Sequence, residues 1–314
     1  MTSSAITASG LRKSYGNKIV LDGIDLDVRA GTVFSLLGPN GAGKTTTVNV
    51  LTTLMKADGG TVHVAGHDVA TEAKSVRAAI GVTGQFAAVD ELLTGQENLQ
   101  LMVDLNPVPT DEGKRIIADL LERFELVESA SKPVSTYSGG MRRKLDLAMT
   151  LVGDPRIIFL DEPTTGLDPR SRRTMWTIIR DLVADGVTIF LTTQYLEEAD
   201  QLADQIAVLN QGRLVAQGTA EELKRQVPGT HIRLRFTTTH ELDAAAHIFS
   251  GSTRDDDALT LRVPGDGGTK SVRALLDTLD EHSISAEEFS VQTPDLDDVF
   301  LALTGQTHST EAAK

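Results

Sequence analysis

The chain lacks three features that would point to particular classes of protein. None of its 314 residues is a cysteine, which excludes disulfides, thiolate metal sites and a catalytic thiol. It has no run of about 18 apolar residues, so we expect no membrane span, and its start lacks the apolar core of a secretory signal. Basic residues are also scarce, with 30 Lys and Arg against 44 Asp and Glu, a net charge of −14. Because affinity for phosphate backbones needs a basic surface, this balance argues against a nucleic-acid partner.

The length and the charge distribution indicate two domains. At about 150 residues per domain, the length suggests about two. Residues 226–314 hold 7 Lys and Arg against 15 Asp and Glu, so this part is more acidic per residue than the rest. Pro228-Gly229 is a plausible linker. We therefore expect a large domain over residues 1–228, a small domain over 229–305 and a disordered tail over 306–314.

The hydrophobic pattern predicts an α/β fold. In the large domain, short apolar strands alternate with helices, which is typical of a mostly parallel sheet. The strands are expected at 5–8, 21–28, 32–37, 61–65, 80–83, 156–160, 187–192 and 205–209, with helices at 44–55, 75–80, 170–184 and 196–203. Residues 87–152 are expected to form a helical subdomain with helices at 95–105, 111–124 and 139–152. The small domain is expected to have strands at 232–236, 259–263 and 284–291 and helices at 242–249, 270–282 and 296–303.

A glycine-rich sequence lies between the strand expected at 32–37 and the helix that follows. It reads Gly38-Pro39-Asn40-Gly41-Ala42-Gly43-Lys44-Thr45, which matches the phosphate-loop pattern G-x-x-x-x-G-K-[ST]. Its backbone N–H groups can turn inward around a polyphosphate, and the helix N-terminus adds positive potential. We expect Lys44 to reach the β- and γ-phosphates, Thr45 to bind Mg²⁺ and Thr46 to contact a phosphate oxygen. An accidental match has a chance of roughly one in a hundred in such a chain.

Two adjacent carboxylates end the apolar strand expected at 156–160. They belong to Asp161 and Glu162. Parallel strands place functional groups at their carboxyl ends, so we expect Asp161 to bind Mg²⁺ and Glu162 to accept a proton from an attacking water. By itself, an apolar run followed by Asp-Glu is more often an ordinary strand end. Together with the phosphate loop it predicts a nucleotide-hydrolysing site.

A second helix N-terminus suited to an anion follows Tyr137. It consists of Ser138, Gly139, Gly140 and Met141. This sequence resembles the signature motif of the ATP-binding-cassette (ABC) ATPases, with Tyr137 and Met141 where Leu and Gln are common. In that family, ATP lies between the phosphate loop of one subunit and the signature of another. The resemblance therefore implies a homodimer closed by two ATP molecules. It also implies the ABC ATPase fold, with a mostly parallel core sheet, an N-terminal antiparallel β subdomain, an inserted helical subdomain and here a small C-terminal α/β domain.

The same resemblance implies roles for three further residues. Tyr15 stands where an aromatic ring stacks on adenine, the alternative being a core tyrosine. Gln85 matches the glutamine that senses Mg²⁺ and the attacking water and whose loop touches the transmembrane partner. Asp168 ends a loop that crosses the dimer interface. Phe86 is a candidate contact with that partner, and a core phenylalanine is an equally good interpretation.

Gln194 departs from the family pattern. It stands where the family usually has a histidine that contacts the γ-phosphate. An amide can donate a hydrogen bond to a phosphate oxygen but cannot carry a proton. We therefore expect Gln194 to position the γ-phosphate and Glu162 to act as the base.

Four segments narrow the resemblance to one type of transporter. Residues 82–85, 137–143, 193–200 and 298–305 look like the daunorubicin/doxorubicin-resistance type of ABC exporter ATPase. This implies a bacterial, ATP- and Mg²⁺-dependent ATPase that powers the efflux of drugs or lipid-like compounds. It would lie at the cytoplasmic face of the cell membrane, bound to a separate transmembrane permease.

Three alternatives remain at this point. One is a transporter subunit for a non-drug substrate. Another is a soluble ABC ATPase that acts on DNA or the ribosome, although such proteins usually carry two cassettes or coiled-coil insertions. The third is a regulatory module without turnover, which Glu162 disfavours.

Two groups of possible metal ligands lie outside these motifs. We expect Asp255, Asp256 and Asp257 to form a solvated loop. His63 and His67 lie four apart, but a strand and a turn are expected there, so we interpret them as surface residues. The small domain shows no catalytic constellation, and we expect it to serve packing or dimerisation.

Overall fold

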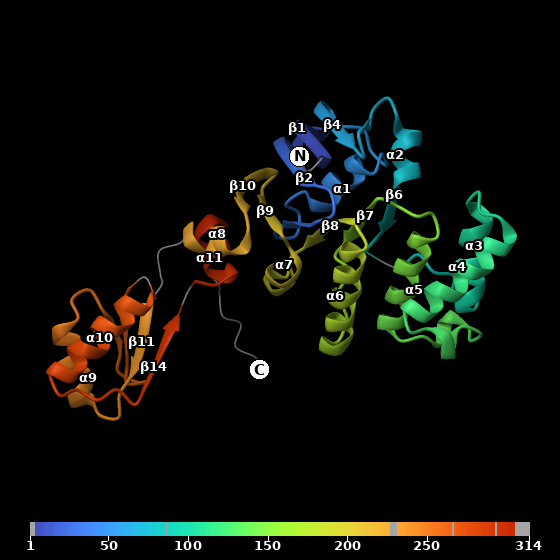
Figure 1. Cartoon of the computed structure of the whole chain (residues 1–314). Coiled ribbons are helices and arrows are strands. Elements are labelled where there is room, and N and C mark those ends of the chain that lie inside the picture. Colours follow the sequence, from blue (N-terminus) through green and yellow to red (C-terminus); the bar gives the residue numbers. More distant parts are fainter. Residues whose placement is uncertain (1–3, 86, 227–230, 266, 293, 305–314) are drawn as a thin grey trace. The chain divides into compact units, whose positions relative to one another are not determined.

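The computed structural model describes residues 4–85, 87–226, 231–265, 267–292 and 294–304 (Figure 1). The chain divides into two compact units, Met1–Ala220 and Glu221–Lys314. Each unit has a hydrophobic core of its own. In the described ranges, no helix combines the length and apolar character needed to cross a bilayer.

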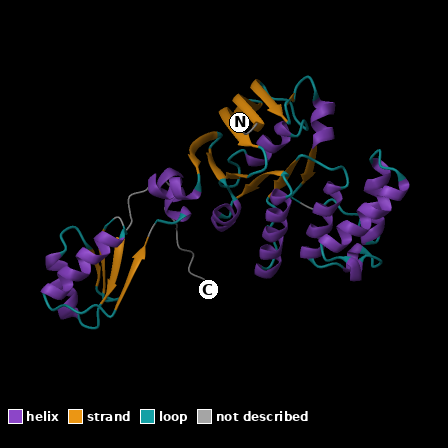
Figure 2. Cartoon of the chain, in the orientation of Figure 1, coloured by secondary structure: helices purple, strands orange, loops and turns teal. Residues whose placement is uncertain are grey.

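A mostly parallel sheet forms the centre of the first unit (Figure 2). Within the described residues it has six strands in the order β10-β9-β3-β8-β7-β6. Their bounds are Arg213–Gly218, Gln205–Asn210, Val33–Leu37, Thr188–Thr193, Ile157–Asp161 and Ile80–Thr83. All neighbours are parallel except β10 and β9. The parallel sheet predicted from the alternating strands and helices is therefore confirmed.

The central strands β3, β8 and β7 are buried along their whole length. Their phenylalanines stack across the sheet, with the Phe190 ring centroid 5.4 Å from that of Phe34 and 5.5 Å from that of Phe159. Mainly apolar strands that are buried throughout are typical of parallel strands covered on both faces. The helices of this part are α1 (Lys44–Leu51), α2 (Ala73–Ala79), α6 (Pro169–Ala184) and α7 (Leu196–Leu202).

The N-terminal part of this unit forms a second sheet, which is antiparallel. Its order is β2-β1-β4-β5, with bounds Lys18–Arg29, Ser4–Tyr15, Gly59–Val64 and His67–Asp68. Buried side chains such as Ile6, Leu26 and Val62 pack against α1 residues in one core cluster. This is the antiparallel subdomain implied by the family resemblance.

The inserted subdomain contains the three helices predicted for it. They are α3 (Gly95–Leu105), α4 (Thr110–Arg123) and α5 (Gly139–Leu151), with short 3-10 turns η1 (Val127–Ser129) and η2 (Val134–Thr136). A capping box between Thr94 and Glu97 starts α3. Tyr137, just before α5, donates its hydroxyl to the carbonyl oxygen of Ser129 at 2.7 Å. A Cβ on Gly95 would lie 2.3 Å from that hydroxyl oxygen.

The second unit is a small α/β domain. Its sheet order is β12-β13-β11-β14, with bounds Thr253–Asp255, Thr260–Pro264, His231–Arg235 and Glu288–Gln292, and all its pairs are antiparallel. Helices α9 (Thr239–Ile248) and α10 (Thr269–Glu281) share its core, which includes Leu234, Leu261 and Leu275. The unit also contains α11 (Leu296–Thr304) and, except for its first residue, α8 (Ala220–Gln226).

Some elements differ from the sequence prediction. The helix expected at 44–55 ends at Leu51, and the last strand begins at Glu288 and not at residue 284. Four elements were not expected from the sequence, namely β5, β10, α8 and β12. The strand β10 could not be recognised from the hydrophobic pattern, because it lies at the sheet edge and its side chains are mostly exposed or half-buried.

The acidic run at 255–257 is exposed and in part paired. Asp255 belongs to β12, and the two following aspartates lie in the adjoining turn. Asp256 accepts hydrogen bonds from Arg254, whose guanidinium also pairs with Asp243 at 2.9 Å. The run is therefore part of a surface ion-pair group.

A pair of leucines tests the importance of the parallel sheet. Leu191 in β8 is 0% exposed, whereas Leu92 is 89% exposed. We expect Leu191→Ala to lower the free energy of unfolding by about 2–5 kcal/mol, because it removes buried methyl groups and leaves a cavity. Leu92→Ala should change it by no more than about 0.5 kcal/mol. The single tryptophan, Trp176, lies in the first unit together with both leucines. Its fluorescence during urea unfolding therefore reports the stability of both variants. Equal effects would contradict the assignment of the core.

Candidate active site

The phosphate loop connects β3 to α1 in a conformation that its glycines permit. A Cβ on Gly38 would lie 2.4 Å from the carbonyl oxygen of Leu209, so the loop passes too close to β9 for any side chain. Gly43 has φ +113°, in the left-handed region that favours glycine. The loop then enters α1 at Lys44, and the first N–H groups of that helix point toward the loop.

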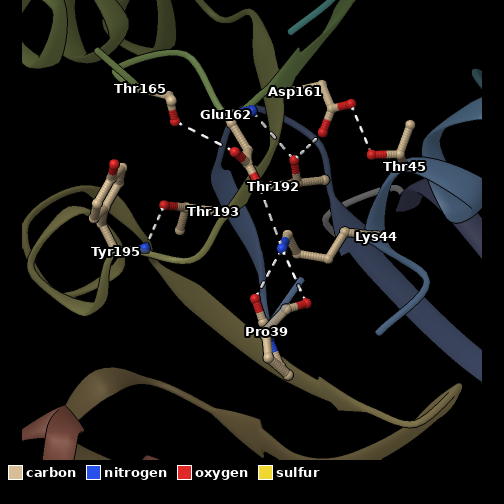
Figure 3. A network of polar contacts seen from close by, with 10 residues as sticks. Pro39, Lys44, Thr45, Asp161, Glu162, Thr165, Thr192, Thr193 and Tyr195 are labelled. Atoms are coloured by element: carbon tan, nitrogen blue, oxygen red, sulfur yellow. Dashed lines mark hydrogen bonds and ion pairs between the residues drawn. The ribbon is translucent and has the colours of Figure 1, made fainter. Parts of the chain in front are cut away.

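Lys44 turns its ammonium group back into the loop (Figure 3). Its Nζ donates to the carbonyl oxygens of Gly38 at 2.8 Å and Pro39 at 3.3 Å. The same Nζ lies 3.3 Å from Oε1 of Glu162. The side chain is only 5% exposed, so its positive charge is buried in the loop, next to a carboxylate.

Asp161 ends β7 with each carboxylate oxygen held by a threonine hydroxyl. Thr45 of α1 donates to Oδ2 at 3.0 Å, and Thr192 of β8 donates to Oδ1. The parallel register of β7 and β8 places Asp161 beside Thr192. A carboxylate and a hydroxyl are hard oxygen ligands of the kind that Mg²⁺ prefers. Thr45 and Asp161 thus fit a magnesium ion bound beside a polyphosphate.

Glu162 follows in a strained backbone conformation. Its φ is +51°, a left-handed value that costs a non-glycine residue on the order of 1–3 kcal/mol. Its N–H donates to the carbonyl oxygen of Thr192 at 3.1 Å. The side chain is buried, and its Oε2 accepts a hydrogen bond from Thr165 at 3.3 Å. Strain of this kind is characteristic of functional sites, because the surrounding contacts must hold it in place.

Gln194 lies at the same edge of the sheet. It directly follows β8, whose last residue Thr193 accepts a hydrogen bond from the N–H of Gly38 at 3.2 Å. Thr193 also accepts from the N–H of Tyr195 at 2.9 Å, which fixes the turn around Gln194. The half-buried Gln194 is therefore adjacent to the start of the phosphate loop.

Gln85 and Tyr15 lie outside the network drawn in Figure 3. Gln85 is exposed and comes two residues after β6, which pairs with β7. Tyr15 ends β1, is 48% exposed and donates its hydroxyl to Sδ of Met55 at 3.1 Å. The interpretation of Tyr15 as a core tyrosine is therefore wrong. Phe86 lies outside the described residues.

The signature residues cap α5 and also lie outside that network. Oγ of Ser138 accepts a hydrogen bond from the N–H of Met141 at 3.3 Å, and Ser138 and Gly139 are exposed. A Cβ on Gly140 would lie 2.7 Å from Oγ of Ser171, so the first turns of α5 and α6 approach closely. Within one copy, the structure thus presents the signature on a surface.

Asp168 caps the N-terminus of α6. Its carboxylate accepts hydrogen bonds from the hydroxyl of Ser171 at 2.6 Å and from the N–H groups of Ser171 at 3.0 Å and Arg170 at 2.9 Å. These bonds, that of the Ser171 hydroxyl first, hold the pKa of Asp168 below its usual range. The cap fixes the end of the loop that begins at Thr165.

The sequence motifs assign no role to Thr192 or Glu198, and they place Thr165 in the loop that ends at Asp168 without indicating its contact with Glu162. For Thr192, the available signal was a polar residue at the end of the apolar strand expected at 187–192. Glu198 of α7 is fully buried, and its Oε1 accepts from Thr164 at 2.8 Å and from Nε1 of Trp176 at 3.3 Å. It joins α7 and α6 to the segment that follows Glu162. Burial raises the pKa of Glu198, against the opposing effect of hydroxyl donors.

The raised pKa predicts how stability changes with pH. The unfolded chain releases the Glu198 proton near the ordinary value of 4.5, whereas the folded chain holds it to higher pH. The contribution of this group to the free energy of unfolding therefore falls as the pH rises above 4.5 toward the folded pKa. We expect Glu198→Gln, which does not titrate, to lose less stability between about pH 5 and pH 8 than the wild type. Urea unfolding measures this, with the exposed Glu197→Gln as control. An unchanged pH dependence in Glu198→Gln would contradict the prediction.

Comparisons with known proteins agree with this geometry. Residues 21–165 match the family described as ABC transporter, and residues 218–304 match the C-terminal domain described as that of ATP-binding protein DrrA1-3-like. The chain is 47% identical over 315 residues to the daunorubicin resistance ATP-binding protein DrrA3 of Streptomyces coeruleorubidus, with 100% of both chains covered. It is 43% identical over 314 residues to the doxorubicin resistance ATP-binding protein DrrA of Mycobacterium tuberculosis, covering 96% of this chain and 93% of the other.

A solved ATP binding subunit of an ABC transporter has the same fold. It matches 71% of this chain and 93% of its own length, with a TM-score of 0.64 and 28% sequence identity. The phosphate loop, the Asp161-Glu162 pair and the similarity over the whole length thus all indicate the same family. The chain belongs to the ABC transporter family, as an ATP-hydrolysing nucleotide-binding subunit with a DrrA-like C-terminal domain.

Proposed function

We propose that this ATPase powers a membrane exporter of drugs or similar hydrophobic compounds, together with a separate transmembrane permease. The observation that carries the ATPase activity is the contact of Lys44, from the phosphate loop, with Glu162 at the end of β7, whose Oε1 lies 3.3 Å from the lysine Nζ. The similarity to daunorubicin and doxorubicin resistance proteins over the whole chain supports the class of cargo. The exporter subunit would act at the cytoplasmic face of the cell membrane.

ATP binding rests on residues 38–46. Backbone N–H groups of the loop and of the first turn of α1 would surround the phosphates, and Lys44 would contact the β- and γ-phosphates. The exposed ring of Tyr15 would stack on adenine. The net charge of −14 does not prevent binding, because these local groups carry positive potential where the phosphates lie.

Magnesium would be held by Thr45 and Asp161, with Gln85 as a further oxygen ligand. The 3.0 Å contact between Thr45 and Asp161 supports the first two, because it brings a hydroxyl and a carboxylate to one point. When bound, the ion would neutralise phosphate charge and orient the β- and γ-phosphates.

Hydrolysis would use Glu162 as the general base. A water oxygen attacks the γ-phosphorus, its proton passes to a carboxylate oxygen of Glu162, and the bond from the γ-phosphorus to the β,γ-bridging oxygen breaks. Thr165 and Lys44 hold the Glu162 carboxylate from two sides. Gln194 would donate a hydrogen bond to a γ-phosphate oxygen and so position it for attack.

Two copies would bind two ATP molecules at a shared interface. Residues 138–141 are exposed or half-buried at the start of α5, which supports their contacting the nucleotide of a second copy. Asp168 would lie at the same interface. Since ATP would touch both copies, it favours the closed dimer, and hydrolysis reopens it. The small domain, proposed as residues 229–305, would support this assembly.

The permease would dock on the segment after Gln85 and on α3. Leu92, Leu101 and Leu105 are large apolar residues that remain exposed there. Leu101 and Leu105 lie four positions apart on α3, and Leu92 precedes that helix, so we propose this segment as the protein contact. The transported compound itself would contact the permease, so the cassette determines the energy source and not the cargo.

The base is tested by Glu162→Gln. Glutamine cannot accept the proton of the attacking water, so we expect turnover to fall by about 10²–10⁴-fold. Binding of a fluorescent ATP analogue should stay near the wild-type level, because the phosphate loop is unchanged. Phosphate release from the purified chain with Mg²⁺ and ATP measures turnover, with Glu197→Gln as control. Near-normal turnover in Glu162→Gln would show that another group acts as the base.

The exporter function is tested in cells that contain the chain and its permease. Lys44→Ala removes the ammonium that contacts the phosphates, so these cells should accumulate as much doxorubicin as cells without the chain. Lys56→Ala changes an exposed lysine outside the site and should keep wild-type efflux. Fluorescence of accumulated compound is compared for several drugs. Efflux that persists in Lys44→Ala cells would count against this role.

A further inference from the structure

Arg143 of α5 is a buried side chain that the motifs leave unexplained. It lies three residues after Gly140, and its side chain is 8% exposed. Its Nε donates to the carbonyl oxygen of Pro163 at 3.0 Å, and its Nη2 donates to that of Asp161 at 3.2 Å. Its Nη1 donates to the carbonyl oxygen of Gly84 at 2.7 Å and to Oδ2 of Asp146 at 3.3 Å. Every nitrogen of the guanidinium therefore has an acceptor.

Two of these acceptors flank the proposed base. Asp161 precedes Glu162 and Pro163 follows it, so Arg143 holds the backbone on both sides of that residue. Glu162 needs such support, because its φ of +51° is disfavoured for a residue with a side chain. The hydrogen bond from its N–H to Thr192 restrains it from β8, and Arg143 restrains it from α5.

The ion pair of Arg143 with Asp146 also holds the chain around Gln85. Arg143 binds the carbonyl oxygen of Gly84, directly before Gln85. Oδ1 of Asp146 accepts a hydrogen bond from the N–H of Ala88 at 2.9 Å, shortly after it. Both sides of Gln85 are thus attached to α5 through one pair of side chains.

The burial of Arg143 and Asp146 indicates that this pair serves to position other groups. Burial lowers the pKa of Arg143 and raises that of Asp146, since both charges lose water. A buried ion pair is a weak source of stability compared with apolar packing of the same volume. What the planar guanidinium offers here is donors in three directions, fixed relative to one another.

We propose that Arg143, oriented by Asp146, is a positioning residue for ATP hydrolysis, an inference that rests on the proposed function. It fixes the backbone of Glu162 and the segment around Gln85 to the helix that begins with the signature. Glu162 serves the nucleotide of its own copy, whereas residues 138–141 serve that of the partner. Arg143 therefore links the two nucleotide sites of the dimer. It makes no contact with the phosphate loop among the hydrogen bonds of the described residues, so its effect falls on hydrolysis and not on ATP binding.

Arg143→Lys in the full chain tests this link. Lysine keeps the charge but cannot serve three separate carbonyl groups with its single ammonium. We expect kcat to fall at least about tenfold, while Kd for a fluorescent ATP analogue stays within about twofold. Hydrogen exchange should become faster at the amides of Glu162 and Ala88. Arg142→Lys is the matched control, because Arg142 is the neighbouring arginine and pairs with Glu91 at the surface. Its kcat should stay within about twofold of the wild type.

The outcomes separate the positioning role from a merely structural one. A folded Arg143→Lys variant with wild-type kcat, or with hydrolysis and binding lost in parallel, overturns the proposal. If this variant does not fold, Asp146→Asn decides, because it keeps the acceptor for Ala88 and removes the charge. We expect its kcat to fall at least about threefold with unchanged binding, and a wild-type kcat overturns the proposal. A wild-type chain without ATP hydrolysis would instead refute the proposed function itself.

Discussion

The parallel pairing of β3, β8 and β7 is the constraint on which the site depends. It aligns the carboxyl ends of three buried strands, so that the phosphate loop, the Thr192-Thr193 pair and the Asp161-Glu162 pair meet at one edge. The contacts of Lys44 and Thr45 with the two carboxylates then follow from residues that are 116 or more positions apart. If the register of β8 slipped by one residue, Thr192 would no longer face Asp161.

The sequence was sufficient for the parts of the site that are coded in contiguous residues. The phosphate loop and the two carboxylates could be predicted because each needs a fixed local spacing, and most helices because of their periodicity. Glu198 and Arg143 could not be found in this way. Their partners lie on other elements, and a buried charge gives no signal in a pattern of apolar residues. The strand β10 and the helix α8 were missed because exposed or short elements carry weak periodicity.

Buried polar residues determine the geometry of this site. Thr192 and Arg143 are buried, and each fixes a backbone group or a carboxylate that a reaction would need in one place. Such groups are expensive to bury unless every donor and acceptor is satisfied. The dense hydrogen bonding around β7 and β8 therefore allows charge and backbone strain to coexist in the centre of a parallel sheet.

Tyr137 shows how one side chain constrains a distant position in the sequence. Its hydroxyl bonds to the carbonyl oxygen of Ser129 and leaves no room for a Cβ at Gly95. A leucine at position 137 would lack the hydroxyl that causes this conflict. The two positions should thus evolve together: relatives that keep the tyrosine keep the glycine, whereas relatives with leucine are free to carry alanine or serine at the start of α3.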